Sequence, residues 1–396
     1  MSIVIVLSFF NQLFTLLFSQ IMKRLLPLCL LFAAAFIVSC KSTGVVADSQ
    51  SHGVDASGNV WMNPPPAGQG IQIAILPFTV PDSAEVQGDF YLNIPSDVPF
   101  NVGRIEVAMN DGTHHMNLYK SNKVWPPDSG KPRAVAFSHD NGSIDTMNVR
   151  YQDEFNATIV RGDSGEMMVE AQVPYLNWEF PTLKEGPNAG HQTCVHFEAN
   201  QKIVIENHYV NIPNLTGGGS QTTPNGKGKI IVNLWKSTEA QPAIAAMMFA
   251  RKPNLVVETG DHTYSKDCKW GGAQGPYADT TLYILGMTGH FHSRGKSFWV
   301  EKRQSYNDIH GNPTDSLVAN IYQSITWNEP PFDVYPTPVK VNLGKGEFLR
   351  YYSEYVNTTA NPIPFGAHVA TQEHMNLFVW FTPGLFNAAT CYDDAP

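Results

Sequence analysis

The chain has 396 residues, of which 43% are hydrophobic, and its formal net charge is -9. This length predicts about two domains with sizeable cores. The acidic balance and the lack of a Lys/Arg run argue against a nucleic-acid partner. The 22 Phe, 15 Tyr and 8 Trp residues supply enough apolar surface to argue against disorder, and the 31 Gly and 28 Pro residues are typical of a turn-rich β protein.

The N-terminal segment has the pattern of an export signal. Residues 1–21 are apolar and uncharged, and a short basic stretch then precedes an apolar run over 25–38 that ends at Ser39 and Cys40. This order predicts a signal peptide over 1–40, with a transmembrane anchor beginning at Met1 as the alternative. We interpret residues 1–21 as the product of an upstream start codon.

Cys40 closes a segment that resembles a bacterial lipobox. The resemblance implies cleavage before Cys40 and attachment of lipid to its thiol. We therefore expect an exported protein that is anchored by lipid to a membrane of a bacterial cell envelope, in the periplasm or at the cell surface. Residues 41–68, rich in Ser, Gly and Pro, predict a flexible tether.

The remaining cysteines do not form a disulfide scaffold. Apart from Cys29 and Cys40, the chain has Cys194, Cys268 and Cys391. Three thiols allow one disulfide at most and leave one cysteine over. The sequence does not specify which pair forms.

Short β-branched runs predict an all-β fold. They cover residues 71–75, 104–108, 202–205 and 229–234. A helical period is suggested only near 240–250, and a composition shift over 237–253 predicts a domain boundary. We therefore expect two β-sandwiches. The predicted domains span 69–236 and 237–387, with a tail over 388–396.

Histidine spacing indicates metal binding. His290 and His292 are two residues apart in a predicted strand, so both imidazoles lie on one face and can reach one ion. His114 and His115 are neighbours, and joint ligation needs a twist, a bulge or different ring nitrogens. His208 ends a predicted strand. The alternative for each is an ordinary core or surface histidine.

A further cluster is less specific. His191, Cys194 and His196 lie close together in the sequence. They could form an extra metal site, but we favour polar residues on a connecting strand.

The ordered set of motifs resembles a known family. These motifs are His114-His115-Met116, His208-Tyr209, His290-Phe291-His292 followed by Gly295-Lys296, and Glu373-His374-Met375-Asn376-Leu377-Phe378. Over about residues 70–385 they are similar to the copper type II, ascorbate-dependent monooxygenases, which include peptidylglycine alpha-hydroxylating monooxygenase and dopamine beta-monooxygenase. The resemblance implies two antiparallel, jelly-roll-like β-sandwich domains that face each other across a cleft, with one copper each.

The resemblance also implies the ligands. The electron-supplying copper would be bound by three histidines of the first domain, His114, His115 and His208. The copper that handles dioxygen and substrate would be bound in the second domain by His290 and His292. We expect the two groups to face each other rather than to join.

The third ligand of the second copper departs from the family, which uses a Met. An ungapped alignment on Glu373 and Asn376-Leu377 places His374 at that position. Met375, the alternative ligand, then falls where the family has a Cys, and Ser353 falls where the family has the partner of that Cys. Because neighbouring strand residues point to opposite faces, only one of the two candidates can face the metal.

The implied activity is copper-dependent monooxygenation. Dioxygen and a one-electron donor such as ascorbate would hydroxylate a C–H bond of a small molecule or an exported peptide, with no catalytic residues beyond the ligands of two coppers. Thr288 and Phe378 replace the Arg and Tyr that hold a peptide carboxylate in peptide-hydroxylating members, so a C-terminal glycine substrate is not expected. The alternatives are a non-catalytic copper-binding lipoprotein on the same fold and a surface interaction protein without the chemistry.

Overall fold

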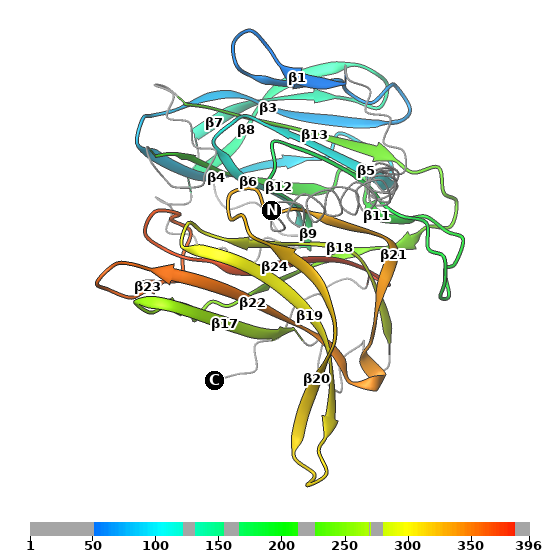
Figure 1. Cartoon of the computed structure of the whole chain (residues 1–396). Coiled ribbons are helices and arrows are strands. Elements are labelled where there is room, and N and C mark those ends of the chain that lie inside the picture. The colour runs from blue at the N-terminus through cyan, green and yellow to red at the C-terminus, as the bar shows by residue number, and fades with distance from the viewer. Residues whose placement is uncertain are drawn as a thin grey trace, which may run out of the picture. The chain divides into compact units, whose positions relative to one another are not determined.

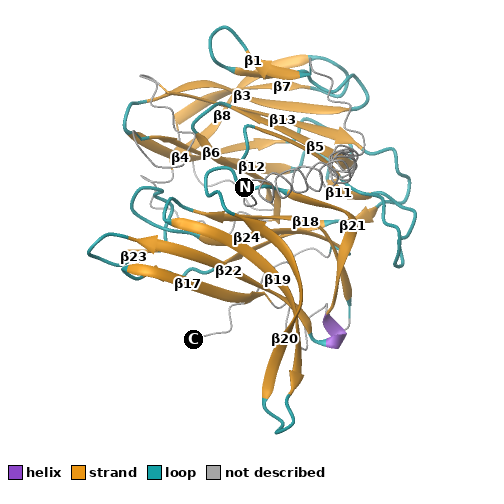
Figure 2. Ribbon diagram, in the orientation of Figure 1, coloured by secondary structure: helices purple, strands orange, loops and turns teal. Residues whose placement is uncertain are grey.

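Strands account for nearly all regular structure in the described part of the chain (Figures 1 and 2). The computed structural model describes residues 51–121, 131–153, 166–212, 226–268, 270 and 280–384. Within these ranges, the only helix is the short 3-10 element η2 (Leu343–Lys345), and no helix has the length and apolarity needed to cross a membrane. The predicted signal peptide, Cys40, Cys391 and the tail over 388–396 lie outside the described residues.

One large sheet contains most of the first half of the chain. Its strand order is β14-β11-β5-β13-β3-β7-β8-β4-β12-β6-β9, and β10 also pairs with β5. Its strands are β3 (Gly70–Val80), β4 (Ala84–Asn93), β5 (Phe100–Met109), β6 (Thr113–Ser121), β7 (Lys131–Ser138), β8 (Ile144–Asp153), β9 (Glu166–Ala171), β10 (Tyr175–Glu179), β11 (Thr193–Phe197), β12 (Lys202–Asn211), β13 (Gly226–Lys236) and β14 (Ala243–Ile244). The four predicted β-branched runs fall in β3, β5, β12 and β13. We call this sheet and the core that it encloses the first sandwich.

Part of the predicted tether is ordered. β1 (His52–Val54) and β2 (Val60–Met62) pair as an antiparallel ribbon. Val60 and Met62 are buried against Ala74, Ala108 and Ile231 of the large sheet. The tether prediction is therefore wrong for these two strands, because β2 has apolar side chains at alternate positions and so buries one face.

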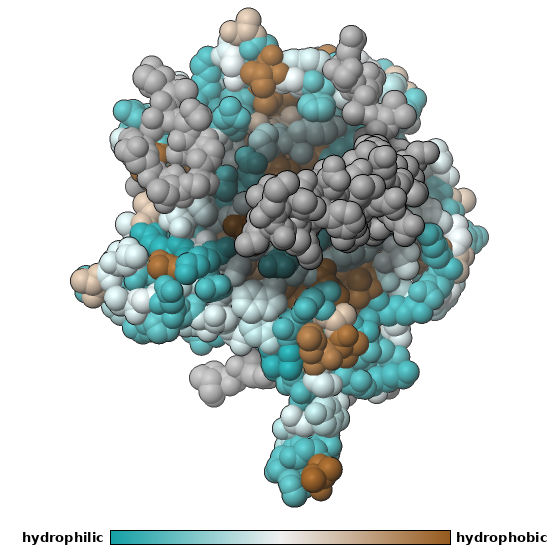
Figure 3. Space-filling model, viewed as in Figure 1, coloured by the Kyte–Doolittle hydropathy of each residue, from teal (hydrophilic) through white to brown (hydrophobic). Residues whose placement is uncertain are grey.

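The second half of the chain forms two four-stranded sheets, β15-β24-β18-β21 and β17-β22-β19-β20, which we call the second sandwich, and a short β16-β23 pair. Its strands are β15 (Ala246–Arg251), β16 (Val256–Val257), β17 (Gly260–Cys268), β18 (Thr281–Phe291), β19 (Gly295–Asn307), β20 (Pro313–Ser324), β21 (Asp333–Asn342), β22 (Glu347–Asn357), β23 (Ile363–Pro364) and β24 (Met375–Thr382). The β19–β20 hairpin projects from its sheet (Figures 1 and 3). Its connecting turn includes Ile309, which is 95% exposed.

In the sheet β15-β24-β18-β21, here called the central sheet, the strands β18 and β24 are buried on both faces. In β24, Leu377 and Val379 belong to the core of the second sandwich. The alternate residues Phe378 and Trp380 belong to the core of the first. The ring of Trp380 lies 5.5 Å from that of Trp178 in the first sandwich. The two sandwiches therefore pack directly together through this sheet.

This burial explains one wrong prediction. The segment 240–250, where a helical period is suggested, forms β14 and β15. In β15, Met247 packs in the first core, whereas Ala246 and Met248 pack in the second. A strand that is apolar on both faces has no polar alternation to reveal it. The chain leaves the large sheet after β14 and enters the central sheet at β15; the domain limits 69–236 and 237–387 stay a prediction.

Candidate metal centre

The first histidine group lies on two paired strands. His115 of β6 is opposite His208 of β12, and the register shifts so that the next residue of β12, Tyr209, is opposite Thr113. His114 is thus the extra residue of a bulge, which is one of the irregularities expected to allow ligation by two neighbours. His115 Nε2 lies 3.1 Å from His208 Nδ1, and the His114 ring centroid is 5.2 Å from that of His208. All three side chains are buried.

The second group lies at the end of the central sheet. In β18, Phe291 packs in the core of the second sandwich, so the flanking His290 and His292 face the other way. His374 immediately precedes β24, and its Nδ1 lies 3.1 Å from Nε2 of His290. The ring centroids of His374 and His292 are 4.4 Å apart.

Met375 does not face the histidines. It is fully buried, in the core of the second sandwich, on the face of the central sheet opposite His374. The structure therefore gives these two neighbours the opposite orientations that strand geometry requires, with the imidazole of His374 toward the cluster.

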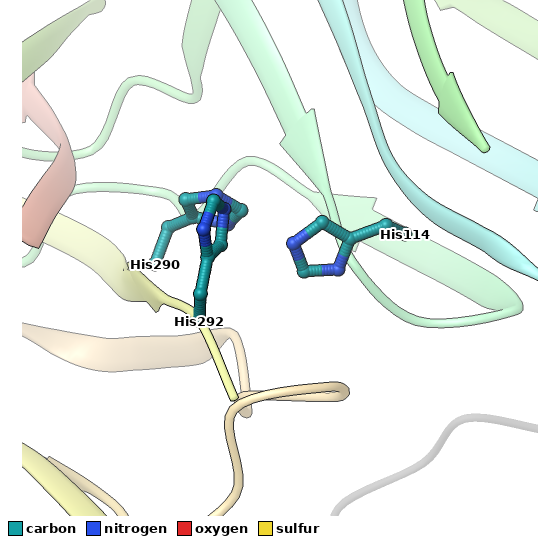
Figure 4. A group of neighbouring side chains, drawn as sticks. All are labelled: His114, His290 and His292. Carbon is teal, nitrogen blue, oxygen red and sulfur yellow. The ribbon is translucent and has the colours of Figure 1, made fainter. Parts of the chain in front are cut away.

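The two groups join, contrary to the expectation that they face each other at a distance. One ring nitrogen from each of His114, His290 and His292 lies within 4.8 Å of the other two. Figure 4 shows His114 approaching from one side and the other two from the opposite side. The centroids of His115 and His290 are 4.9 Å apart. The reason is the central sheet, whose histidine-bearing face packs directly on the first sandwich. We call the six predicted histidines the histidine cluster.

Two polar side chains of the first sandwich hold ring nitrogens that point away from the cluster. Glu85 Oε1 lies 2.7 Å from Nε2 of His208. Gln172 Oε1 lies 2.6 Å from Nδ1 of His290. Burial alone would raise the pKa of Glu85, but the hydrogen bond and charge of His208 outweigh it, and the pKa is lowered.

Backbone and carboxylate groups hold His292 in the same way. Its Nδ1 lies 3.0 Å from the carbonyl oxygen of Gln372. Its backbone N–H donates to Glu373 Oε2 at 3.0 Å. Burial raises the pKa of Glu373 to about 8. Glu85, Gln172 and Glu373 are polar contacts that the sequence analysis did not predict.

Two buried carboxylates near the cluster could have been recognised from the sequence. Glu170 follows the apolar Met167–Val169 run in β9, and Glu206 follows Ile203–Ile205 in β12. Both side chains are almost fully buried and lie 3.8 Å from Nδ1 of His290 and of His115, respectively. An acidic residue within a buried apolar strand needs a compensating partner, which marks such positions for attention.

The histidines are held in the form that binds metals. Burial, followed by the charge of neighbouring histidines, keeps the pKa values of His114 and His290 well below the ordinary range. Burial lowers the pKa of His292 to about 3. Neutral imidazole has one bare nitrogen. Nε2 of His114 and Nε2 of His292 are buried without a hydrogen-bond partner among the described residues.

This donor set fits copper. The cluster contains two buried ring nitrogens without a hydrogen-bond partner among the described residues, on His114 and His292. It also contains two pairs of ring nitrogens, each 3.1 Å apart. That separation suits two ligands of one ion with metal–nitrogen bonds of about 2.0–2.1 Å. A set of imidazoles without thiolate suits copper, which binds nitrogen ligands more tightly than the other divalent first-row metals.

The less specific cluster does not assemble. His191 Nδ1 lies 3.4 Å from Glu239, and His196 Nδ1 lies 2.9 Å from Asn101 Oδ1. Cys194 is buried and is not in a disulfide. Cys268 is disulfide-bonded. The structure thus excludes Cys194 from the single disulfide that the sequence allows.

Comparisons with known proteins give no family. No family model and no curated protein matches the chain. A solved structure of infectious bursal disease virus, Gx strain, is 8% identical with a TM-score of 0.18, and covers 85% of this chain and 65% of its own. The CBM22-1-CBM22-2 tandem domain from Paenibacillus barcinonensis Xyn10C is 9% identical with a TM-score of 0.17, over 77% of this chain and 82% of its own. TM-scores this low carry no argument about fold or function.

Proposed function

We propose that this protein is a copper-dependent monooxygenase that hydroxylates a C–H bond of a small molecule or exported peptide, with dioxygen and a one-electron donor such as ascorbate. The observation that carries the proposal is the buried histidine cluster, with two nitrogen pairs at 3.1 Å. The order of its members along the chain, which resembles the copper type II monooxygenases, supports the same reading. Export and lipid attachment at Cys40 belong to this proposal.

The histidines divide between two ions. His115 and His208 would hold one copper, and His290, His292 and His374 the other. His114 lies between the groups, with its ring centroid 5.2 Å from His208 and 4.9 Å from His290. Bound copper would supply one-electron redox chemistry and the activation of dioxygen.

Apolar side chains around the cluster would exclude water from the reaction. The ring of Trp327 lies 5.7 Å from His114. Phe365 lies 4.8 Å from His374, and Phe378 lies 6.4 Å from His290. Low local polarity strengthens every electrostatic contact made there.

Thr288 and Phe378, which stand where the peptide-hydroxylating members have Arg and Tyr, bear on which substrate can bind. Thr288 is buried, with Oγ1 3.4 Å from Nε2 of Gln172. Phe378 stacks on Phe249 at 4.8 Å. Neither side chain offers a positive charge to hold a carboxylate, Phe378 has no hydroxyl, and the Thr288 hydroxyl already lies within hydrogen-bond distance of Gln172. We therefore favour a substrate without a C-terminal carboxylate at its reacting end.

One observation favours the alternative, a non-catalytic copper-binding lipoprotein. His208 and His292 are fully buried, and His290 is only 2% exposed. Histidines buried to this degree can hold a metal but leave little exposed surface at which a substrate could reach it.

The test is copper loading followed by oxygen consumption. We expect about two copper ions per chain and ascorbate-dependent oxygen uptake, and the combined His290→Ala and His292→Ala changes should abolish the uptake. His139→Ala is the control, because that histidine pairs with Asp145 away from the cluster. Two coppers without uptake, across a substrate panel, would select the binding protein, and no copper would refute both readings.

A further inference from the structure

Gln172 connects the first sandwich to a proposed ligand in the second. It directly follows β9 and is only 4% exposed. Its Oε1 lies 2.6 Å from Nδ1 of His290, and its Nε2 lies 3.0 Å from the carbonyl oxygen of Gly289. One side chain of the first sandwich therefore contacts two consecutive residues of β18.

The contact with Gly289 fixes the direction of the amide. A carbonyl oxygen only accepts hydrogen bonds, so the group beside it must be the NH₂ of Gln172. The amide oxygen then faces His290, and because this oxygen only accepts, Nδ1 of His290 must carry the proton. A neutral imidazole with its proton on Nδ1 has a bare Nε2.

We propose that Gln172 is a positioning residue that sets His290 in the Nδ1–H tautomer and so presents Nε2 to the metal. This deepens the proposed function and rests on it as regards the metal. Nε2 is also the nitrogen that lies 3.1 Å from Nδ1 of His374, so the tautomer set by Gln172 frees the atom that the second copper group needs. A ligand of the second sandwich is thus oriented from the first.

The same arrangement occurs, with the nitrogens exchanged, at His208. Glu85 Oε1 accepts from the backbone N–H of Val369 at 2.8 Å and lies 2.7 Å from Nε2 of His208. That leaves Nδ1 of His208 beside Nε2 of His115, 3.1 Å away. Outer hydrogen bonds of this kind fix the tautomer of metal-binding histidines in general.

The tautomer is measurable without metal. In protein labelled with ¹⁵N-histidine, long-range proton–nitrogen spectra separate a bare ring nitrogen from a protonated one. We expect His290 of the metal-free wild type to carry its proton on Nδ1. Gln172→Leu should lose this preference, whereas Gln172→Glu, which keeps an acceptor at Nδ1, should retain it. Gln323→Leu, at an exposed position of β20, is the matched control and should change nothing.

Copper binding gives the second readout. Outer-shell changes typically cost about 10–100-fold in metal affinity, and we expect a loss in that range for Gln172→Leu and a smaller loss for Gln172→Glu. A purely structural role would be damaged by both substitutions and would show no such rescue.

The outcomes separate this inference from the proposed function. A proton on Nε2 of His290 in the metal-free wild type would overturn the positioning role, whatever the copper content. An Nδ1–H tautomer in a wild type that binds no copper would overturn the proposed function and leave the orienting role of Gln172 in place. If Gln172→Leu does not fold, the wild-type spectrum and Gln172→Glu still decide the question.

Discussion

The Nδ1 atom of His374 lies 3.1 Å from Nε2 of His290, although the two residues are 84 positions apart in the chain. The contact depends on β24 and β18 being neighbours, with Asn376 opposite His290. His374 stands one residue before β24, on the face that carries His290. Met375 is its immediate neighbour and belongs to the opposite core.

His374→Ala should therefore remove a copper ligand, and Met375→Leu should not. We expect the first change to weaken copper binding by more than the roughly 10–100-fold typical of outer-shell changes. The second conserves core volume and should cost less than about 1.5 kcal/mol of stability. Chelator competition and chemical denaturation measure the two effects. Strong copper loss in Met375→Leu, with little in His374→Ala, would restore the thioether as the ligand.

His114→Ala tests how the cluster divides. Without His114, the remaining nitrogens form a group of three, from His290, His292 and His374, and a pair, from His115 and His208. Because the pair alone is a weak site, we expect the variant to keep one copper ion and lose the other on dialysis against a chelator. Metal analysis gives the ratio, and retention of both ions would show that His114 is not a ligand.

Glu106 predicts a pH dependence of stability away from the cluster. Burial would raise its pKa, but hydrogen bonds from Asn233, Arg104, Trp235 and Tyr175 outweigh this and lower it. A carboxyl group whose pKa is lower in the folded state stabilises the fold above its unfolded pKa, near 4.5, and loses this contribution as the pH falls through the folded value.

Glu106→Gln should therefore be less stable than the wild type at pH 7, by about 1.5–3 kcal/mol, as for hydrogen bonds to charged groups. The difference should shrink as the pH falls below about 4.5, because the wild type then loses what the variant lacks already. Urea denaturation at several pH values measures it. Glu179→Gln, at an exposed position of β10, is the control, and a difference that grows in acid would contradict the prediction.

Trp380 tests whether the two sandwiches unfold together. It is 1% exposed, and its ring lies 5.5 Å from Trp178 and 4.9 Å from Phe180, both in the first sandwich. Trp380→Ala should cost about 3–5 kcal/mol, and wild-type calorimetry should give one transition. Trp299→Ala, at a half-buried Trp that stacks on Tyr352, should cost less. Two separate wild-type transitions, with only one shifted in Trp380→Ala, would show independent domains.

Local patterns predicted much of the fold. The β-branched runs over 71–75 and 229–234 lie in β3 and β13, which pair with each other. Strand geometry alone predicted that joint ligation by His114 and His115 needs a twist, a bulge or different ring nitrogens, and the register shift beside His208 supplies a bulge. The opposite orientations of His374 and Met375 followed from the same geometry.

Features that depend on packing between sheets were not predictable in this way. The approach of His114 to His290 requires knowing that the central sheet packs directly on the first sandwich. The strand nature of β15 was hidden because both of its faces are apolar. Gln172 and Glu85 carry no local signal, since their partners are far away in the sequence, 118 positions for Gln172 and His290.

The central sheet also limits how this protein can vary. A strand with a solvent-exposed face has alternate positions at which polar substitutions are nearly neutral. In β24, every residue from Met375 to Thr382 is buried, so no position of that strand has this freedom. A change in side-chain volume at Leu377 must be absorbed by one core, and a change at the neighbouring Phe378 by the other. Mutational drift in this strand therefore has to be compatible with two separately packed interiors at once.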